Sequence, residues 1–149
     1  MSGEKGSTYA NALLQLIFQN TVASPMSGLG SGLAASGTAG SLYLSLHTAD
    51  PTAGGNQSSS EISYTGYARV AVARSSGGFT VTGNSVSPAA LEAFAASTGG
   101  TGGTAAYFGI GTSSSGAGVL LYAGPISPTI AISSGVTPEL TTATAITES

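Results

Sequence analysis

Charged side chains are scarce in this sequence. Asp, Glu, Lys and Arg make up 6% of its 149 residues, against about 25% in an ordinary soluble domain. A folded monomer of this mass exposes on the order of 6,800 Å², so each charge would serve about 750 Å², close to the ~800 Å² that one partner buries in a standard interface. Such a surface has little electrostatic protection against association. The composition therefore predicts a component of a larger assembly, with much of its surface covered by other protein.

Other absences exclude whole classes of function. The chain has no cysteine, so it forms neither a disulfide framework nor a thiolate metal site. Only three residues are basic, and they form no cluster, which argues against binding to a phosphate backbone. The most apolar stretch, residues 13–18, is too short to span a bilayer, and the polar start precedes no signal-peptide core. We expect no cofactor, no nucleic acid and no membrane contact.

Small residues dominate what remains, and they surround one candidate helix at residues 9–19. Ser7 or Thr8 is placed to cap its start, and Asn20 is a plausible end. The apolar positions at helical spacing are Tyr9, Leu13, Leu16 and Ile17, and Leu14 and Phe18 widen this stripe. The pattern predicts either an ordinary helix packed on a sheet, which we favour, or an N-terminal element that docks on a neighbouring protein.

Alternating and short apolar runs predict strands in the rest of the chain. Residues 41–47 alternate as a half-buried strand, residues 67–74 form a second strand, and a turn leads to residues 79–82. Residues 86–94 are ambiguous because Pro88 interrupts them. Further short runs lie at 105–110, 119–123, 129–132 and 140–146. This spacing predicts a mainly β fold, an antiparallel jelly-roll sandwich of about eight strands with one short N-terminal helix. As a single domain over 1–149, it divides into a helical arm (1–24), a Gly-rich loop (25–40) and the sandwich (41–149).

The reactive side chains do not form a catalytic pattern. His47 is the only histidine and stands near Asp50, but no G-x-S-x-G elbow accompanies it, so we interpret it as a strand-end histidine bonded to a nearby carbonyl. The carboxylates are scattered, and a glycosidase pair such as Asp50 with Glu61 has little support. Gly109-x-Gly111 and the glycines at 99–103 lack a P-loop lysine and are interpreted as turns. We predict that the chain is not an enzyme.

The most distinctive charges are Arg69 and Arg74, which hold two of the three positive charges. Each is predicted at one end of the strand at 67–74, on opposite faces, and two roles are open. An arginine there can form a bidentate contact with a carboxylate of a partner, or it can simply serve solubility or a local ion pair with Glu61. The residues that we expect at interfaces are Tyr9, Leu13, Phe18, Tyr43, Tyr64, Tyr67, Arg69 and Arg74.

Several stretches carry a resemblance to a known family. They are residues 7–18 (STYANALLQLIF), 42–51 (LYLSLHTADP), 61–64 (EISY) and 66–72 (GYARVAV), with 106–110 (AYFGI) and 119–124 (VLLYAG) later in the chain. The sequence resembles a family of small tailed-bacteriophage virion proteins, described either as capsid cement (decoration) proteins or as tail-fibre-like. The resemblance implies a non-enzymatic jelly-roll module on the virion.

Two functions follow from this resemblance and the composition. The first is a capsid cement protein on the outside of the shell, which stabilises it by bridging major capsid subunits and forms homodimers or homotrimers on local symmetry axes. The alternative is an adsorption module of a tail or head fibre that binds a host surface glycan, for which Tyr43, Tyr64, Tyr67 and Tyr107 would supply stacking rings. The absence of tryptophan argues against glycan binding, and neutral, small-residue surfaces with extended loops suit wide contacts on a shell, so cement is the first expectation.

Overall fold

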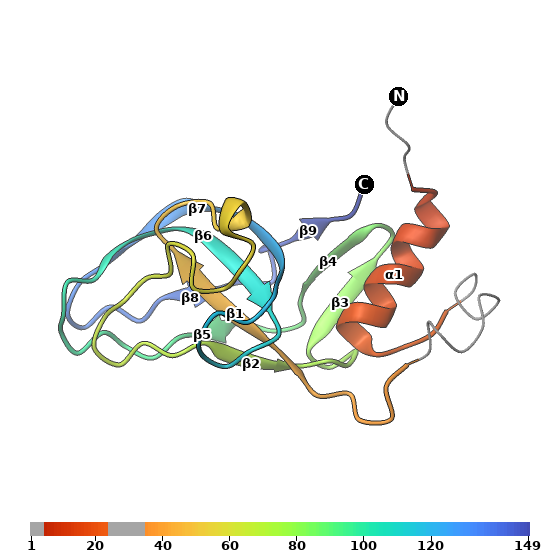
Figure 1. The fold of residues 1–149 in the computed structure, drawn as a ribbon, viewed down its shortest axis with the longest axis horizontal. Coiled ribbons are helices and arrows are strands. Elements are labelled where there is room, and N and C mark those ends of the chain that lie inside the picture. Colours follow the sequence, from red (N-terminus) through yellow and green to blue (C-terminus); the bar gives the residue numbers. More distant parts are fainter. Residues whose placement is uncertain (1–4, 24–34) are drawn as a thin grey trace. The chain divides into compact units, whose positions relative to one another are not determined.

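The chain divides into two compact units, each built from segments that are distant in sequence (Figure 1). The computed structural model describes residues 5–23 and 35–149. Unit 1 comprises Met1–Ser41, Ala73–Ala90 and Thr142–Ser149, and unit 2 comprises Leu42–Val72 and Leu91–Thr141. Most of the predicted Gly-rich loop, residues 25–34 of 25–40, lies outside the described residues. The single-domain organisation over 1–149 stays a prediction.

Unit 1 contains the helix α1, Ser7–Gln19. It ends as predicted, because Asn20 adopts a left-handed conformation (φ 52°) and its N–H bonds to the carbonyl of Gln15. The start differs from the prediction. Gly6, rather than Ser7 or Thr8, is the N-cap, and no side chain bonds to the first turn.

The helix packs on a small antiparallel sheet within unit 1. This sheet has the strand order β3-β4-β9, where β3 is Phe79–Thr82, β4 is Ser85–Pro88 and β9 is Ile146–Thr147. Phe18 meets Phe79 edge-on with 5.0 Å between ring centroids, and Ala10 and Leu14 lie buried on the same helix side. Ala10, Leu14 and Phe18 follow the helical spacing i, i+4, i+8. They form a buried row, and Ala12 is buried as well, whereas the stripe expected from Tyr9, Leu13, Leu16 and Ile17 is only partly buried.

Unit 2 is organised around a four-stranded sheet with the order β2-β1-β6-β7. The strands are β1 (Ser41–His47), β2 (Val70–Ala73), β6 (Gly103–Gly111) and β7 (Leu120–Ile132), and only the end residues Ser41 and Ala73 belong to unit 1. β6 runs antiparallel to both β1 and β7. The two-residue strands β5 (Glu92–Ala93) and β8 (Glu139–Leu140) form a separate pair, and the 3-10 turn η3 covers Thr52–Gly54.

The core of unit 2 lies on one face of β1, where Leu42, Leu44 and Leu46 are at most 4% exposed. The opposite face is also covered, since Ser45 and His47 are fully buried. The prediction of a half-buried strand was therefore wrong for β1. The reason is polar rather than apolar packing: the buried amide of Gln57, in the segment after β1, donates to the carbonyl of Tyr43 and accepts from the N–H of Ser113.

Two glycines of β6 make room for this polar layer. Gly109 pairs with Ser45, and Gly111 pairs with Tyr43. A Cβ on Gly109 would lie 2.6 Å from Nε2 of His47, and a Cβ on Gly111 would overlap the side chain of Gln57. Gly109-x-Gly111, predicted as a turn, is therefore part of a strand in which only glycine leaves space for buried side chains.

The mainly β fold with one N-terminal helix is confirmed, but the eight-stranded jelly roll is not. The described residues form sheets of four, three and two strands without a closed barrel. The runs at 119–123 and 129–132 are one strand, β7, which contains Pro125 and Pro128 and shows register shifts against β6. The run at 140–146 divides in the opposite way, because β8 belongs to the two-stranded sheet and β9 to the three-stranded sheet.

Candidate binding site

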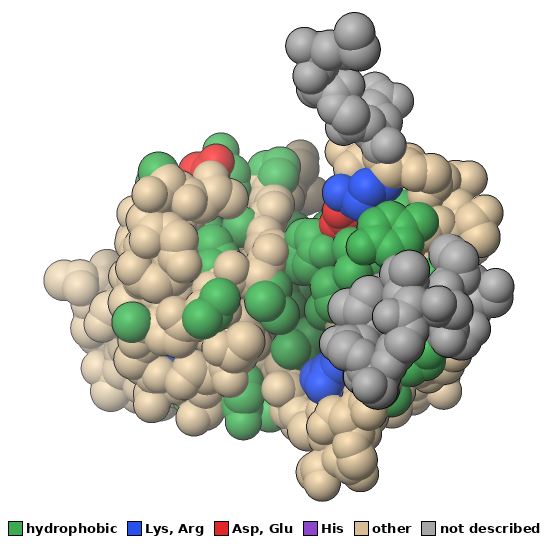
Figure 2. Space-filling view, turned by 45° about the vertical axis from the view of Figure 1, so that its right-hand side comes forward, with side chains coloured by type: hydrophobic (Ala, Val, Ile, Leu, Met, Phe, Trp, Pro, Cys, Tyr) green, Lys and Arg blue, Asp and Glu red, His purple; other side chains and the backbone are tan. Residues whose placement is uncertain are grey.

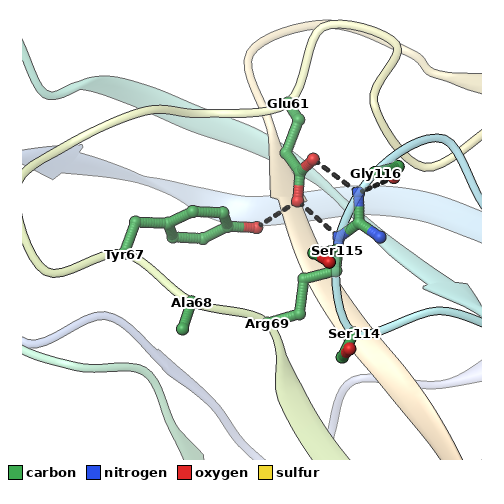
Figure 3. A pocket seen from close by; sticks show the side chains of 7 residues that line it. All are labelled: Glu61, Tyr67, Ala68, Arg69, Ser114, Ser115 and Gly116. Carbon is green, nitrogen blue, oxygen red and sulfur yellow. Dashed lines mark hydrogen bonds and ion pairs between the residues drawn. The ribbon is translucent and has the colours of Figure 1, made fainter.

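A buried ion pair between Glu61 and Arg69 forms the floor of the candidate site in unit 2 (Figure 3). Glu61 is held by a β-bridge to His47, at the end of β1, and Arg69 directly precedes β2. Nε and Nη2 of Arg69 each donate to a different oxygen of the Glu61 carboxylate, both at 2.7 Å. The bond to Glu61 raises the pKa of Arg69, so the guanidinium stays charged.

Arg69 also fastens the loop between β6 and β7. Its Nη1 donates to the carbonyl of Ser113 at 2.9 Å, and Nη2 donates to the carbonyl of Gly116 at 2.7 Å. Its side chain is 2% exposed, against 16% for Glu61. The sequence left the role of Arg69 open, and in the structure Arg69 forms the local ion pair with Glu61. Arg69 is buried within unit 2, where its guanidinium satisfies backbone carbonyls that the loop leaves unpaired.

Tyr67 completes the polar floor. Its hydroxyl donates to Oε1 of Glu61 at 2.9 Å and accepts from the N–H of Leu46 at 3.1 Å. Burial raises the pKa of this phenol, so it stays protonated. Its ring stacks on Phe94, with centroids 6.1 Å apart, and meets Tyr64 edge-on. Both of these partners reduce the ring surface that Tyr67 offers to a ligand.

A cleft of about 280 Å³ lies beside this floor. Its lining residues are Glu61, Tyr67, Ala68, Arg69, Ser114, Ser115 and Gly116 (Figure 3). The residues at the rim (Ala68, Ser114, Ser115 and Gly116) are all exposed. The cleft therefore offers hydroxyl and backbone groups above an ion pair whose net charge is zero.

The lining does not contain the two carboxylates of a glycosidase. Asp50 is exposed and is not part of the cleft. Its Oδ1 accepts from the N–H of Thr52 at 2.9 Å and from the Thr52 hydroxyl at 2.8 Å. These bonds lower the pKa of Asp50, so it is a poor proton donor at neutral pH. The structure does not bring Asp50 and Glu61 together in this cleft.

His47 is structural, as predicted. A carbonyl only accepts, so the ring N–H lies on Nδ1 and donates to the carbonyl of Ser59 at 2.8 Å. Nε2 then accepts from the hydroxyl of Ser45, also at 2.8 Å. Both side chains are fully buried, which withholds this Ser-His pair from any substrate and lowers the pKa of His47. Within the described residues, no group of three or more side chains is suited to hold a metal ion.

Arg74, in unit 1, has a role that neither sequence hypothesis foresaw. Its guanidinium donates to the carbonyls of Ile17 (2.7 Å) and Leu16 (2.8 Å) in the last turn of α1, and to that of Ala39 (3.0 Å). Carbonyls in the last turn of a helix lack intrahelical partners and carry the negative end of its dipole. Arg74 thus caps the helix from a segment 57 residues away.

The remaining interface candidates divide by exposure. Phe18 is fully buried and Tyr64 is 6% exposed, with its hydroxyl donating to the carbonyl of Ala95. Both therefore contribute to the interior of their own units. Tyr9, Leu13 and Tyr43 are partly exposed, and their role at an interface stays a prediction. Sequence reasoning missed the 113–116 loop as a partner of Arg69, although its run of Ser and Gly is typical of a turn with unpaired carbonyls.

Fold and site together define a β-rich module with a polar cleft in unit 2. The chain belongs to the family described as "Podophage GP4 fiber I protein gp80", whose model matches residues 6–147. No curated protein matches the sequence. The chain is accordingly a non-enzymatic fibre component of a phage virion. None of the helices in the described ranges is long and apolar enough to cross a membrane.

Family membership corrects the first functional expectation. The family is described as a fibre protein and not as a capsid cement protein, so the assignment to the capsid exterior has no support. Family membership places the chain in the virion and supports the alternative, a fibre module, over a capsid cement protein. The partners expected from the sequence, the major capsid protein and sister copies of the chain, stay predictions.

Proposed function

We propose that this chain is an adsorption module of the phage fibre and that it binds a neutral glycan on the host surface in the Glu61–Arg69 cleft. The observation that carries the proposal is the match to a fibre family over residues 6–147. Fibre proteins are the virion components placed to meet the host, and the cleft supplies a site with suitable chemistry.

The electrostatics of the cleft favour an uncharged ligand. Glu61 and Arg69 neutralise each other through two hydrogen bonds, and the rim residues carry no charge. An anionic ligand would find no unpaired cation here, and a cationic ligand would compete with Arg69 for Glu61. Sugar hydroxyls both donate and accept, so they match the serine hydroxyls and backbone groups of the rim.

The size of the cleft sets how much of a glycan it can hold. Its volume of about 280 Å³ lies just below the range of about 300–1,000 Å³ that is typical of small-molecule pockets. The cleft therefore suits one sugar residue of a longer chain. Strong attachment would then come from several copies acting together, because linked weak sites bind a repeated ligand far more tightly than one site does.

Filling the cleft tests the proposal. Ser114 is exposed and lines the cleft, so Ser114→Phe occupies the space without touching the buried pair. The purified chain, fluorescently labelled, is added to host cells and, in saturation-transfer NMR, to neutral polysaccharide released from the host envelope. We expect Ser114→Phe to weaken both signals about tenfold or more, as loss of good hydrogen bonds in a shallow site does.

A matched control has the same change outside the cleft. Ser76 is an exposed serine in the turn before β3, so Ser76→Phe adds the same ring to unit 1 and should bind like the wild type. The proposal fails if the wild type binds neither cells nor polysaccharide. It also fails if Ser114→Phe, with an unchanged unfolding midpoint, binds as well as Ser76→Phe.

A further inference from the structure

The carboxylate of Glu61 is the part of the cleft floor that a ligand can reach. The Glu61 side chain is 16% exposed, whereas that of Arg69 is 2% exposed. Both line the cleft, and Glu61 is the acidic member of that lining (Figure 3). The sequence has six acidic residues, and Figure 2 shows charged atoms as small spots on one face of the molecule. A charged oxygen at the floor of a cleft is therefore a rare feature on this surface.

The guanidinium of Arg69 offers a ligand almost nothing. A guanidinium donates hydrogen bonds and does not accept them. Arg69 already donates two hydrogen bonds to the carboxylate of Glu61 and one each to the carbonyls of Ser113 and Gly116. Because its side chain is also almost fully buried, a ligand that presents an acceptor to the floor of the cleft gains no hydrogen bond from Arg69.

The two oxygens of the Glu61 carboxylate differ in the hydrogen bonds that they accept. Each carboxylate oxygen has two lone pairs. Oε1 accepts from Nε of Arg69 and from the hydroxyl of Tyr67, so both of its lone pairs are used. Among the described residues, Oε2 accepts from Nη2 of Arg69 alone. The floor of the cleft therefore retains one acceptor position on Oε2, and this position requires a donor.

We infer that Glu61 is the specificity-determining residue of the cleft and that its Oε2 accepts a hydrogen bond from an unsubstituted hydroxyl of the glycan. This inference rests on the proposed function and narrows the ligand to sugars that present such a hydroxyl. An ester or ether at that position has no proton to donate and would leave a partly desolvated carboxylate oxygen without its hydrogen bond. The serine hydroxyls of the rim both donate and accept, so they discriminate less between these ligands.

Two double variants test the acceptor in the absence of the ion pair. Arg69→Met/Glu61→Leu has no acceptor at position 61, whereas Arg69→Met/Glu61→Gln keeps an amide oxygen with one lone pair for Tyr67 and one for the ligand. Both variants lack Arg69 and the negative charge, so the effect of that loss on the 113–116 loop is common to them. In NMR titrations with neutral polysaccharide released from the host envelope, we expect the variant with Glu61→Gln to bind about tenfold or more tightly than the variant with Glu61→Leu.

The wild type supplies a second readout that leaves the ion pair unchanged. The chain has five glutamates, and labelling them with carbon-13 at Cδ makes each carboxylate visible by NMR. The Glu61 resonance is the one absent from Arg69→Met/Glu61→Leu. We expect the polysaccharide to shift this resonance and to leave those of Glu92 and Glu139, which do not line the cleft, in place. In Ser114→Phe, where the added ring fills the cleft, the shift should be absent.

The outcomes separate this inference from the proposed function. A wild type that binds the polysaccharide without a shift of the Glu61 resonance overturns the inference and leaves glycan binding intact. Equal affinities of the two folded double variants overturn it as well, and if either variant does not fold, the wild-type resonance decides. A wild type that does not bind the polysaccharide overturns the proposed function and this inference together.

Discussion

Arg69 joins Glu61, eight residues before it, to the carbonyls of Ser113 and Gly116, which lie 44 and 47 residues further along the chain. One guanidinium thereby fixes both the carboxylate at the end of β1 and the loop between β6 and β7. The floor and part of the rim of the cleft depend on this side chain. Its removal should therefore affect both stability and ligand binding.

Arg69→Met should destabilise unit 2 by about 3–5 kcal/mol, because it leaves a largely buried carboxylate without its partner. The double variant Arg69→Met/Glu61→Leu should recover much of this loss, since it removes both charges and replaces them with apolar groups. Urea unfolding of the single and double variants measures the difference. Equal destabilisation of the two would contradict the role of the unpaired charge.

A second ion pair provides the control for this comparison. Lys5 and Glu148 form a salt bridge in unit 1, where the Lys5 side chain is 35% exposed and the Glu148 side chain 12%. Because solvent reaches the lysine end of this pair, the pair contributes about 0–1 kcal/mol, so Lys5→Met should shift the urea midpoint only slightly. A loss as large as that of Arg69→Met would show that burial does not explain the difference between the two pairs.

Acid should weaken the fold through His47. Burial lowers its pKa below the ordinary value of 6.5. Above that value the ring is neutral in both states. Below it the unfolded chain binds a proton that the folded chain does not, so the free energy of unfolding falls as the pH drops towards the folded-state pKa. Glu61 opposes this shift and Arg69 adds to it.

Because His47 is the only histidine, one variant isolates the effect. Urea unfolding at intervals between neutrality and about pH 5 should show a decline in the wild type that is absent from His47→Gln, once its lower overall stability is subtracted. The low pKa of Asp50 acts only in stronger acid, below its ordinary value of 3.8. Parallel curves for the two proteins in this window would show that His47 does not carry the proton linkage.

Local patterns in the sequence were sufficient to predict several helices and strands or their ends. The alternation at 41–47 and the run at 79–82 coincide with β1 and β3, and Asn20 ends α1 as predicted. These signals depend only on neighbouring residues. His47 was also foreseen as a residue bonded to a nearby carbonyl, because a histidine at a strand end has few other ways to satisfy its ring nitrogens.

The failures depend on partners that are far away in sequence. The runs at 119–123 and 129–132 were predicted as separate strands, but β7 continues through Pro125 and Pro128, which an edge strand tolerates. Gly109 was taken for a turn residue because the buried side chains that it accommodates, Ser45 and His47, lie on another strand. The cleft was missed for the same reason, since its two sides come from residues 61–69 and 114–116.

Gly109→Ala should be strongly destabilising. The added methyl group would lie 2.6 Å from Nε2 of His47 and 2.8 Å from Oγ of Ser45, both of which are fixed by hydrogen bonds. Overpacking of this kind typically costs about 1–3 kcal/mol, and thermal or urea unfolding measures it. Gly77→Ala is the control, because the nearest atom there lies at 3.7 Å. A Gly109→Ala variant as stable as Gly77→Ala would show that the polar layer on β1 is loosely packed.

Arg74→Leu should loosen the end of α1 selectively. The leucine keeps an aliphatic stem but leaves the carbonyls of Leu16 and Ile17 without the guanidinium that donates hydrogen bonds to them. Hydrogen bonds to a charged group contribute about 1.5–3 kcal/mol, so amides in the last turn of α1 should exchange faster by about tenfold or more.

Arg74→Lys supplies a point charge without the forked donors. The exchange rate of these amides in Arg74→Lys should therefore lie between that of the wild type and that of Arg74→Leu. If Arg74→Lys exchanges as fast as Arg74→Leu, charge contributes nothing and the forked geometry alone caps the helix; if both match the wild type, Arg74 does not cap it.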